Sequence, residues 1–334
     1  MGETRIWHGG DLDEARALFP GAPEPWIDLS TGINPVPYPV PELTPRLFER
    51  LPAPGDVAEL ERAAAAAYGA RMPETVVAAP GTQVLISVLP HLRAPGRVAI
   101  LGPTYAEHAR AWAAAGHEVV EVDELAAAHG ADAAVAVNPN NPDGRRLDPE
   151  ALAATAAKLQ ARGGLLVVDE AFADFERDLS IIPHLPDGAV VLRSFGKTFG
   201  LAGVRLGFAV ASAPLIERIR TALGPWAVSG PAIEIGARAL RDGAWLEETA
   251  RARGGDRDRL HALLARTAGV GSCGTTLYRL IETPLAPALF DHLGRHGLWT
   301  RRFQGRPDRL RFGLPPDEAA WRRLDEALRA FRPG

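Results

Sequence analysis

Short apolar runs alternate with longer stretches rich in alanine and leucine over most of the chain. Runs of this length predict strands, and the stretches between them predict helices. The predicted strands cover 75–79, 97–101, 118–122, 133–137, 164–168, 189–193 and 205–211. The predicted helices lie near 56–68, 82–92, 105–115, 148–162 and 213–222. Since strands buried on both sides are apolar throughout, this alternation predicts a mostly parallel sheet with helices on both faces, an α/β fold.

The pattern changes after Gly224 and Pro225. A long helical region, a Gly/Thr-rich strand and two further helices predict a smaller α+β domain, with the helices near 231–266, 285–296 and 317–331. The first forty or so residues are rich in proline and glycine, so they predict an extended arm rather than a helix. We therefore expect an N-terminal arm that packs with the small domain, a large domain and a small C-terminal domain, at 1–45, 46–224 and 225–334.

Composition narrows the functional classes. With 334 residues the chain can bury a large core, and its 46% hydrophobic content and formal net charge of -4 give no reason to expect nucleic-acid binding. The single cysteine, Cys273, excludes an internal disulfide and a cysteine-rich zinc site, and the histidines show no metal-ligand spacing. The chain begins with no apolar signal core and contains no uncharged apolar run that could span a bilayer. We expect a cytoplasmic protein with no metal and no membrane partner.

The glycine-rich run from Val190 to Phe208 holds a lysine between a hydroxyl and an arginine. An amine in an apolar setting loses solvation of its charged form, so its pKa falls and it can condense with an aldehyde. Lys197 is the candidate for this role. Ser194 could donate to a phosphate, and Arg205 carries a planar, permanently charged guanidinium that suits the same group. The run can therefore hold pyridoxal 5'-phosphate.

Polar residues also follow other predicted strands, where parallel sheets bind their ligands. Asp169 and Glu170 end the apolar run that begins at Leu165. Pro80 to Gln83 closes one strand and opens an apolar helix, whose free N–H groups and dipole favour a phosphate. The turn Asn138–Gly144 follows another strand. These loops predict a site along one edge of the sheet.

The lysine run matches the pattern S-x-x-K-x-x-x-x-x-G-x-R at Ser194, Lys197, Gly203 and Arg205. It thus resembles the cofactor segment of fold-type I pyridoxal-phosphate enzymes, which share the class I/II aminotransferase fold. The resemblance implies that Lys197 carries the cofactor and that Ser194 and Arg205 bind its phosphate. It also implies that Asp169 pairs with the pyridinium nitrogen and keeps the ring able to accept electrons.

Further segments resemble the same family. Asn138 to Gly144 is similar to its N-P-x-N-P-x-G turn, which implies that Asn141 donates to the ring oxygen of the cofactor. Tyr105 occupies the position of the aromatic residue that stacks on the ring. The family's phosphate-binding turn is matched by Gly81, Thr82 and Gln83.

Two positions depart from the family pattern. The family often has a tyrosine three residues after the aspartate, and this chain has Phe172 there. Many members also have a Tyr-Pro-x-Pro segment that reaches the phosphate of the neighbouring subunit. The corresponding run here begins with Leu51 and reads Leu-Pro-Ala-Pro. That contact across subunits is therefore in doubt, although the resemblance still implies a homodimer.

The N-terminal arm resembles that of the threonine-phosphate decarboxylases of cobalamin synthesis. The shared segments are Trp7–Asp11 and Asp28–Pro35, together with the block Asp169–Phe175. The resemblance implies that His8 lies near the substrate phosphate and that Gly32 and Asn34 lie near the substrate, a small phosphorylated amino acid. Near the other end, Leu310–Gly313 resembles the strand whose arginine, here Arg311, receives the substrate α-carboxylate.

Three functional hypotheses follow. The resemblance implies decarboxylation of L-threonine O-3-phosphate to (R)-1-amino-2-propanol O-2-phosphate. A histidinol-phosphate-type aminotransferase is the alternative, because the orientation of the substrate decides which bond at its α-carbon breaks, and the fold and cofactor serve both reactions. A cofactor-binding module without turnover is a third hypothesis. The intact set of lysine, aspartate, asparagine and phosphate-binding residues argues against it.

Overall fold

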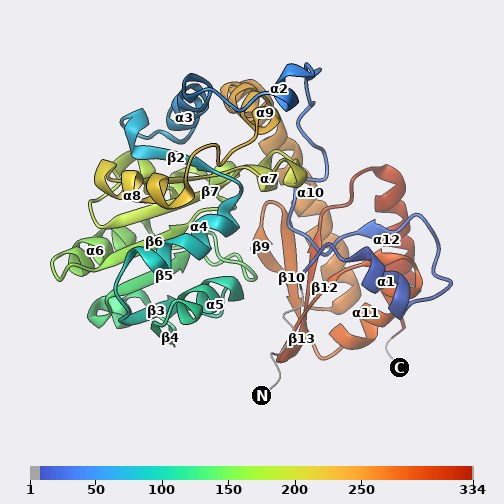
Figure 1. Ribbon diagram of the computed structural model, residues 1–334. Helices are drawn as coiled ribbons and strands as arrows, with labels where there is room; N and C mark the ends of the chain where they lie inside the picture. The colour runs from blue at the N-terminus through green and yellow to red at the C-terminus, as the bar shows by residue number, and fades with distance from the viewer. Residues whose placement is uncertain (1–7, 333–334) are drawn as a thin grey trace. The chain divides into compact units, whose positions relative to one another are not determined.

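The computed structural model describes residues 8–332, which form two compact units (Figure 1). The large unit comprises Pro37–Asn141 and Arg145–Glu247. The small unit comprises the chain up to Val36, the short segment Pro142–Gly144, and the chain from Glu248 onward. Both units mix helices with strands, and the α/β prediction is confirmed.

The sheet of the large unit is mostly parallel. Seven strands of the described chain lie in the order β2-β8-β7-β6-β5-β3-β4. Only β8 runs antiparallel to its neighbours among these strands. The bounds are β2 Val76–Ala79, β3 Arg97–Leu101, β4 Glu118–Val122, β5 Ala133–Val137, β6 Leu165–Asp169, β7 Ala189–Ser194 and β8 Gly207–Ala211. Each predicted strand is present within a few residues of its predicted bounds.

Helices cover both faces of this sheet, as the continuous apolar strands require. One face packs against α3 (Pro54–Tyr68), α6 (Pro149–Gln160) and α9 (Gly230–Arg241). The opposite face packs against α4 (Thr82–Val88), α5 (Ala106–Ala114) and α8 (Ala213–Leu223). Two short helices complete the unit, α2 (Arg46–Glu49) and α7 (Phe195–Thr198). The 3-10 turns of this unit include Pro73–Thr75, Leu89–Leu92, Leu125–Gly130, Ala173–Phe175, Arg177–Leu179, Ile182–His184 and Ala202–Val204.

Strand alternation decides which residues face which helices. Val167 and Leu192 pack into the core on the side of α4 and α5, whereas Val168 and Val191 pack into the core on the side of α3. Successive side chains of a strand point to opposite faces of the sheet. The residues that follow Val168 on β6 and Leu192 on β7 therefore alternate between the two sides. Asp169 and Ser194 therefore belong to the side of α4 and α5. Glu170 and Arg193 belong to the side of α3.

The small unit has a second sheet and its own helices. Its strands lie in the antiparallel order β12-β13-β10-β9, with bounds Arg301–Phe303, Arg306–Gly313, Tyr278–Glu282 and Cys273–Thr275. In a separate pair, β1 (Ile27–Asp28) of the arm runs parallel to β11 (Leu298–Trp299). The helices are α1 (Leu12–Leu18), α11 (Ala286–Arg295), α12 (Glu318–Ala330) and most of α10 (Gly243–Ala268).

Some predicted elements need correction. The arm was expected to contain no helix, but α1 forms there because the Asp11 side chain accepts from the amide of Glu14 and caps it. The predicted helical region 231–266 is two helices. Between them Asp242 ends α9, and its carboxylate accepts from the amide of Trp245. The predicted helix 82–92 is α-helical only to Val88 and continues as the 3-10 turn Leu89–Leu92, which contains Pro90.

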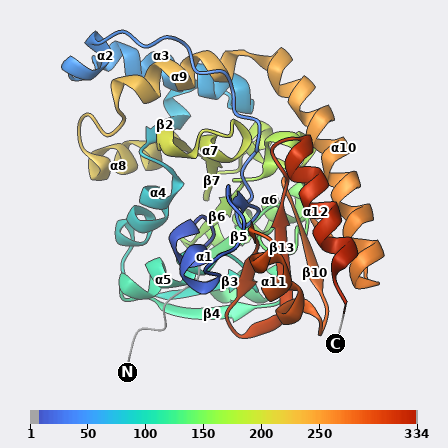
Figure 2. The ribbon, with the colours of Figure 1, turned by 90° about the vertical axis from the view of Figure 1, so that its right-hand side faces the viewer.

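The boundaries between the compact units also differ from those expected at 45 and 224. The chain enters the large unit at Pro37 because the rings of Tyr38, Phe199 and Trp245 pack together there. Helix α9 belongs to the large unit because it packs beside α3, as Figures 1 and 2 show. Gly236 of α9 permits this approach, since a Cβ there would lie 3.0 Å from Cδ1 of Leu60 on α3. Within residues 8–332, no helix combines the length and the apolar character needed to cross a membrane.

Candidate active site

Asp169 is a buried carboxylate at the carboxyl end of β6, with 4% of its surface exposed. Its Oδ1 accepts from the amide of Ala171 at 3.0 Å. Its Oδ2 lies 2.9 Å from Nε2 of His108, which is itself buried on α5. Because an ionised carboxylate can only accept, the histidine nitrogen must donate to it. The acid is thus fixed in position by two donors.

Sequence reasoning missed His108. A histidine one turn after Tyr105 on a predicted helix is a weak signal by itself. Its importance depends on the strand order, because α5 must cross the sheet face onto which β6 directs Asp169. The ring of His108 also meets the ring of Tyr105 edge to face, with centroids 6.1 Å apart. The hydroxyl of Tyr105 in turn donates to Oε1 of Gln83 at 3.2 Å.

Lys197 lies on the one-turn helix α7, directly after β7. Its side chain is half-buried, and Nζ lies 5.8 Å from the centroid of the Phe172 ring. Ser194 ends β7 and is buried, with 8% of its surface exposed. The apolar ring of Phe172 gives the lysine a partly desolvated environment on one side.

Glycines bring four segments close together beside Ser194. Gly81 has φ +88°, and a Cβ there would lie 2.6 Å from Nη2 of Arg205. Gly207 pairs across the sheet with Ser194, and a Cβ on it would lie 2.7 Å from the amide nitrogen of Thr82. A side chain at either glycine would therefore collide with the predicted phosphate-binding groups. The first turn of α4 and the guanidinium of Arg205 thus lie beside these glycines, and Ser194 is the strand partner of Gly207, so this part of the sheet edge would favour an anion.

The backbone of Arg205 is strained. Its φ is 55° and its ψ is 60°, in the left-handed region that non-glycine residues rarely adopt. Within residues 8–332, Trp226 is the other non-glycine residue with positive φ. Such strain persists where the surrounding structure imposes it, and it often marks a functional site.

The turn that carries Asn141 is anchored by its buried neighbours. Asn138 and Asn140 are fully buried, whereas Asn141 is half-buried. The Asn140 side chain donates to the carbonyl of Pro103 at 3.0 Å and accepts from the hydroxyl of Thr104 at 2.6 Å. The turn is thereby joined to the segment that precedes Tyr105.

The other predicted residues lie in the small unit. Arg311 of β13 is buried, donates from Nη2 to the carbonyl of Ser30 at 2.9 Å, and stacks over Tyr278 at 4.7 Å. Asn34 is buried and accepts from Nη1 of Arg253 at 3.3 Å. Gly32 is buried on the same loop.

His8 is exposed, and it lines a small pocket with Ser30, Trp299, Thr300 and Arg301 among others. Trp7, the residue before it in the arm motif, lies outside the described residues. The four residues predicted to bind the substrate, His8, Gly32, Asn34 and Arg311, thus lie in or beside the segment 28–34 of the small unit.

Arg301 is a second residue that sequence reasoning missed. It pairs with Arg311 across β12 and β13, so two guanidiniums occupy neighbouring strands. Burial and the positive charge of Arg301 lower the pKa of Arg311 to about 9. An anion bound between these residues would offset the repulsion and raise the pKa of Arg311 again.

Comparison with known proteins fits this geometry. The model of the family described as aminotransferase class I and II matches residues 27–324. The chain belongs to this family. The predicted resemblance to fold-type I enzymes is confirmed. In the structure of this family member, Lys197 lies directly after β7 of the mostly parallel sheet.

Two similar relatives match almost the whole chain. Threonine-phosphate decarboxylase of Pseudomonas aeruginosa is 44% identical over 330 residues, which cover 97% of this chain and 98% of that protein. Threonine-phosphate decarboxylase of a Sinorhizobium species is 46% identical over 332 residues, which cover 97% of each chain.

Solved structures share the fold. L-Threonine-O-3-phosphate decarboxylase from Porphyromonas gingivalis superposes with a TM-score of 0.74 at 21% identity and covers 98% of each chain. Histidinol-phosphate aminotransferase from Sinorhizobium meliloti, solved in complex with pyridoxal-5'-phosphate, gives a TM-score of 0.76 at 22% identity and covers 90% of each chain.

The strain at Arg205 gives a testable prediction. We expect Arg205→Gly to raise the free energy of unfolding by up to about 1 kcal/mol, because glycine adopts a left-handed backbone without a Cβ penalty. The same change should weaken the binding of inorganic phosphate, since the guanidinium is lost. Urea unfolding with and without phosphate measures both effects. Arg205→Lys, which keeps the strain and a charge, is the control and should not gain stability. A loss of stability in Arg205→Gly would contradict the account.

Proposed function

We propose that the chain is a threonine-phosphate decarboxylase that uses pyridoxal 5'-phosphate. The proposed reaction converts L-threonine O-3-phosphate to (R)-1-amino-2-propanol O-2-phosphate, for the aminopropanol part of cobalamin synthesis. The observation that carries the proposal is the identity of 44% and 46% to two such decarboxylases over 97% of the chain. The prediction made from the arm motifs agrees with these relatives.

The residues of the large unit fit the proposed cofactor. Gly81 and Gly207 leave room that a Cβ would fill, beside Ser194, the Thr82 amide and Arg205, and these groups would hold the phosphate. Asp169 would accept from the pyridinium nitrogen, and Tyr105 would lie against the ring. Asn141 would donate to the ring oxygen. Lys197 would supply the amine that joins the aldehyde.

When bound, the cofactor supplies a ring that accepts electrons from the α-carbon of the substrate. The chain supplies a carboxylate for this chemistry and fixes its position with donors. Asp169 would hold the ring nitrogen of the cofactor, and His108 donates to that carboxylate from the side of α5. The Lys197 amine, three residues after the end of β7, can hold a proton at Nζ.

The small unit supports a substrate with two acidic groups. Arg311 would bind the α-carboxylate through its planar guanidinium, as the resemblance implies. His8, Gly32 and Asn34 would lie near the rest of the substrate, with His8 near its phosphate. The neighbouring charge of Arg301 favours an anionic ligand over a neutral one.

The decisive experiment distinguishes decarboxylation from transamination in a single reaction mixture. Purified protein and cofactor are mixed with threonine phosphate, and both carbon dioxide and the amine form of the cofactor are measured. We expect carbon dioxide with a stoichiometry above one per subunit and unchanged cofactor. Conversion of the cofactor to its amine form, with a requirement for a keto acid, would instead support the histidinol-phosphate-type aminotransferase. Lys197→Ala is the control and should release no carbon dioxide.

The lowered pKa of Arg311 predicts a pH dependence. Arg311 binds a carboxylate only when protonated, so binding should be intact below pH 9 and lost as the pH rises through about 9. We expect kcat/KM, which reports groups of the free enzyme, to fall above that value. Arg311→Met should raise KM about 10- to 100-fold at pH 7. The visible absorbance of the bound cofactor, followed over the same range, controls for titration at Lys197. A kcat/KM that stays constant to pH 10 would refute the assignment.

We also propose a homodimer, supported by an exposed apolar surface on the large unit. Phe48, Leu51 and Trp226 are exposed to 68%, 66% and 57% of their surface. All three line one groove, which also includes Gly203 and Val204 next to Arg205. Large apolar patches of this kind typically mark interfaces between proteins. The groove includes Leu51 and Pro52, the first two residues of the Leu-Pro-Ala-Pro segment, so a second copy is its proposed occupant.

Light scattering tests this interface. We expect the native protein to have the mass of two chains and Leu51→Asp to shift the mass toward one chain, because a charge would be buried in the apolar contact. Met72→Asp is a matched control, since Met72 is an exposed apolar residue that does not line this groove. A monomeric native protein would refute the dimer, and a Leu51→Asp variant that stays dimeric would refute this groove as its interface.

A further inference from the structure

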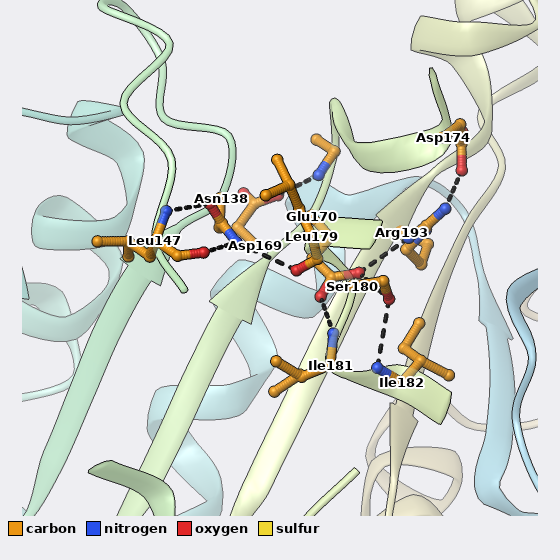
Figure 3. A network of polar contacts seen from close by, with 11 residues as sticks. Asn138, Leu147, Asp169, Glu170, Asp174, Leu179, Ser180, Ile181, Ile182 and Arg193 are labelled. Carbon is orange, nitrogen blue, oxygen red and sulfur yellow. Dashed lines mark hydrogen bonds and ion pairs between the residues drawn. The ribbon is translucent and has the colours of Figure 1, made fainter. Parts of the chain in front are cut away.

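A buried group of charges lies behind the proposed cofactor residues. Glu170, Asp174 and Arg193 are exposed to only 1%, 5% and 3% of their surface. Figure 3 shows them with the end of β6 and the turn that contains Ser180. None of these three side chains takes part in the proposed reaction as a cofactor- or substrate-binding group.

The position of this group follows from strand alternation. Glu170 comes one residue after Asp169, and Arg193 comes one residue before Ser194. Adjacent residues of a strand face opposite sides of the sheet. Asp169 therefore meets His108 of α5 on one side, while Arg193 meets the ring of Tyr68 of α3 on the other, at 4.5 Å. The backbones of β6 and β7 are shared by both sides.

Arg193 joins the two acids. Its Nη1 donates to Oε2 of Glu170 at 2.8 Å, and its Nη2 donates to Oδ1 of Asp174. Glu170 also accepts from the hydroxyl of Ser180 at 2.7 Å and from the amide of Ile181 at 3.0 Å. Every oxygen of Glu170 thus has a donor. The guanidinium links the end of β6 to the end of β7 through side chains, in addition to the backbone bonds between them.

Burial opposes such a group unless it is fully paired. Burial raises the pKa of Glu170, and the charge of Arg193 acts in the opposite direction. Burial also disfavours the charge on Arg193, but Asp174 and Glu170 outweigh it and raise the pKa of the guanidinium. Apolar residues of similar volume often replace buried ion groups with no loss of stability. A gain in stability therefore does not explain why these charges are buried. A satisfied buried network does hold its members in one arrangement, and here it would hold the ends of β6 and β7.

We propose that Arg193 is a positioning residue for the reaction, which fixes through Glu170 and Asp174 the strand ends that carry Asp169, Ser194 and Lys197. The inference rests on the proposed use of pyridoxal phosphate. Arg193 itself touches neither cofactor nor substrate in this account. Its effect is on the distance and angle between the acid at the end of β6 and the groups that follow β7. Small displacements of such groups reduce rates strongly.

The test compares Arg193→Met with Leu159→Ala. Leu159 is a fully buried residue of α6 in the core on the same face of the sheet, so its truncation lowers stability without touching the ion group. Urea unfolding of the cofactor-free proteins measures the loss of stability in each. Cofactor dissociation constants, kcat and KM are then measured on both variants at a temperature where each is folded.

We expect Arg193→Met to lower kcat by about 100-fold, by analogy with misplaced catalytic groups, with KM for threonine phosphate little changed. Its cofactor dissociation constant should rise about 10- to 100-fold, as is typical when residues that orient ligand-binding groups are lost. Arg193→Lys should restore kcat and the cofactor dissociation constant in part, because it keeps the positive charge. The restoration should be incomplete, because one ammonium cannot hold two carboxylates as the guanidinium does. Leu159→Ala should keep the kcat and dissociation constant of the native protein.

Hydrogen exchange of the cofactor-free protein gives a readout independent of activity. We expect faster exchange of the amides of Glu170, Ala171 and Ser194 in Arg193→Met, but not in Leu159→Ala. Should Arg193→Met fail to fold, Ser180→Ala removes one donor to Glu170 and should produce the same changes at smaller size. A purely structural role is the conclusion if Arg193→Met loses stability like Leu159→Ala and keeps native kcat, dissociation constant and exchange.

The inference and the proposed function can fail separately. If the native protein binds the cofactor but releases no carbon dioxide, the proposed decarboxylation fails, and the dissociation constants and exchange rates still decide the role of Arg193. If the native protein releases carbon dioxide and all variants bind and react normally, the positioning role fails alone.

Discussion

The site depends on a carboxylate buried at the end of a parallel strand. An acid with 4% of its surface exposed is stable as an anion only if donors are fixed around it, and Asp169 has the amide of Ala171 and the ring of His108. The α/β arrangement supplies both, because the chain turns at the strand end and α5 crosses the same face. Lys197 follows β7, Thr82 follows β2, and Arg205 precedes the antiparallel strand β8, so the lysine and the proposed phosphate-binding groups lie at the same edge of the sheet.

Close backbone approach is the second requirement. Gly81 and Gly207 let Arg205, Thr82 and Ser194 gather where side chains would prevent it. Arg205 adopts a left-handed backbone to take part. The chain thus accepts local strain and buried charge at one edge of the sheet, and the ordinary cores on both faces stabilise the rest.

Much of the fold could be predicted from the sequence, because each sheet strand is a short apolar run and the intervening helices are rich in alanine. The same pattern also predicted which polar residues, such as Asp169 and Lys197, lie just after the strands. His108 and Arg193 could not be recognised, since their partners are decided by strand order and by the face to which each side chain points. Helix α1 was missed because the proline and glycine content of the arm obscured the cap at Asp11. The boundaries between the two units depend on the packing of α9 against α3 and of Tyr38 against Phe199 and Trp245. These residues are far apart in the sequence, so no local pattern predicts the contacts.

The central claim is that one lysine, Lys197, carries the cofactor opposite Asp169. Borohydride reduction of the protein reconstituted with pyridoxal 5'-phosphate, followed by peptide mass spectrometry, tests it most directly. The account predicts that the added mass lies on the peptide containing Lys197, and that Lys197→Ala leaves the protein unlabelled. Labelling of Lys158, the other lysine of the chain, or a reconstituted protein with no visible absorbance, would contradict it.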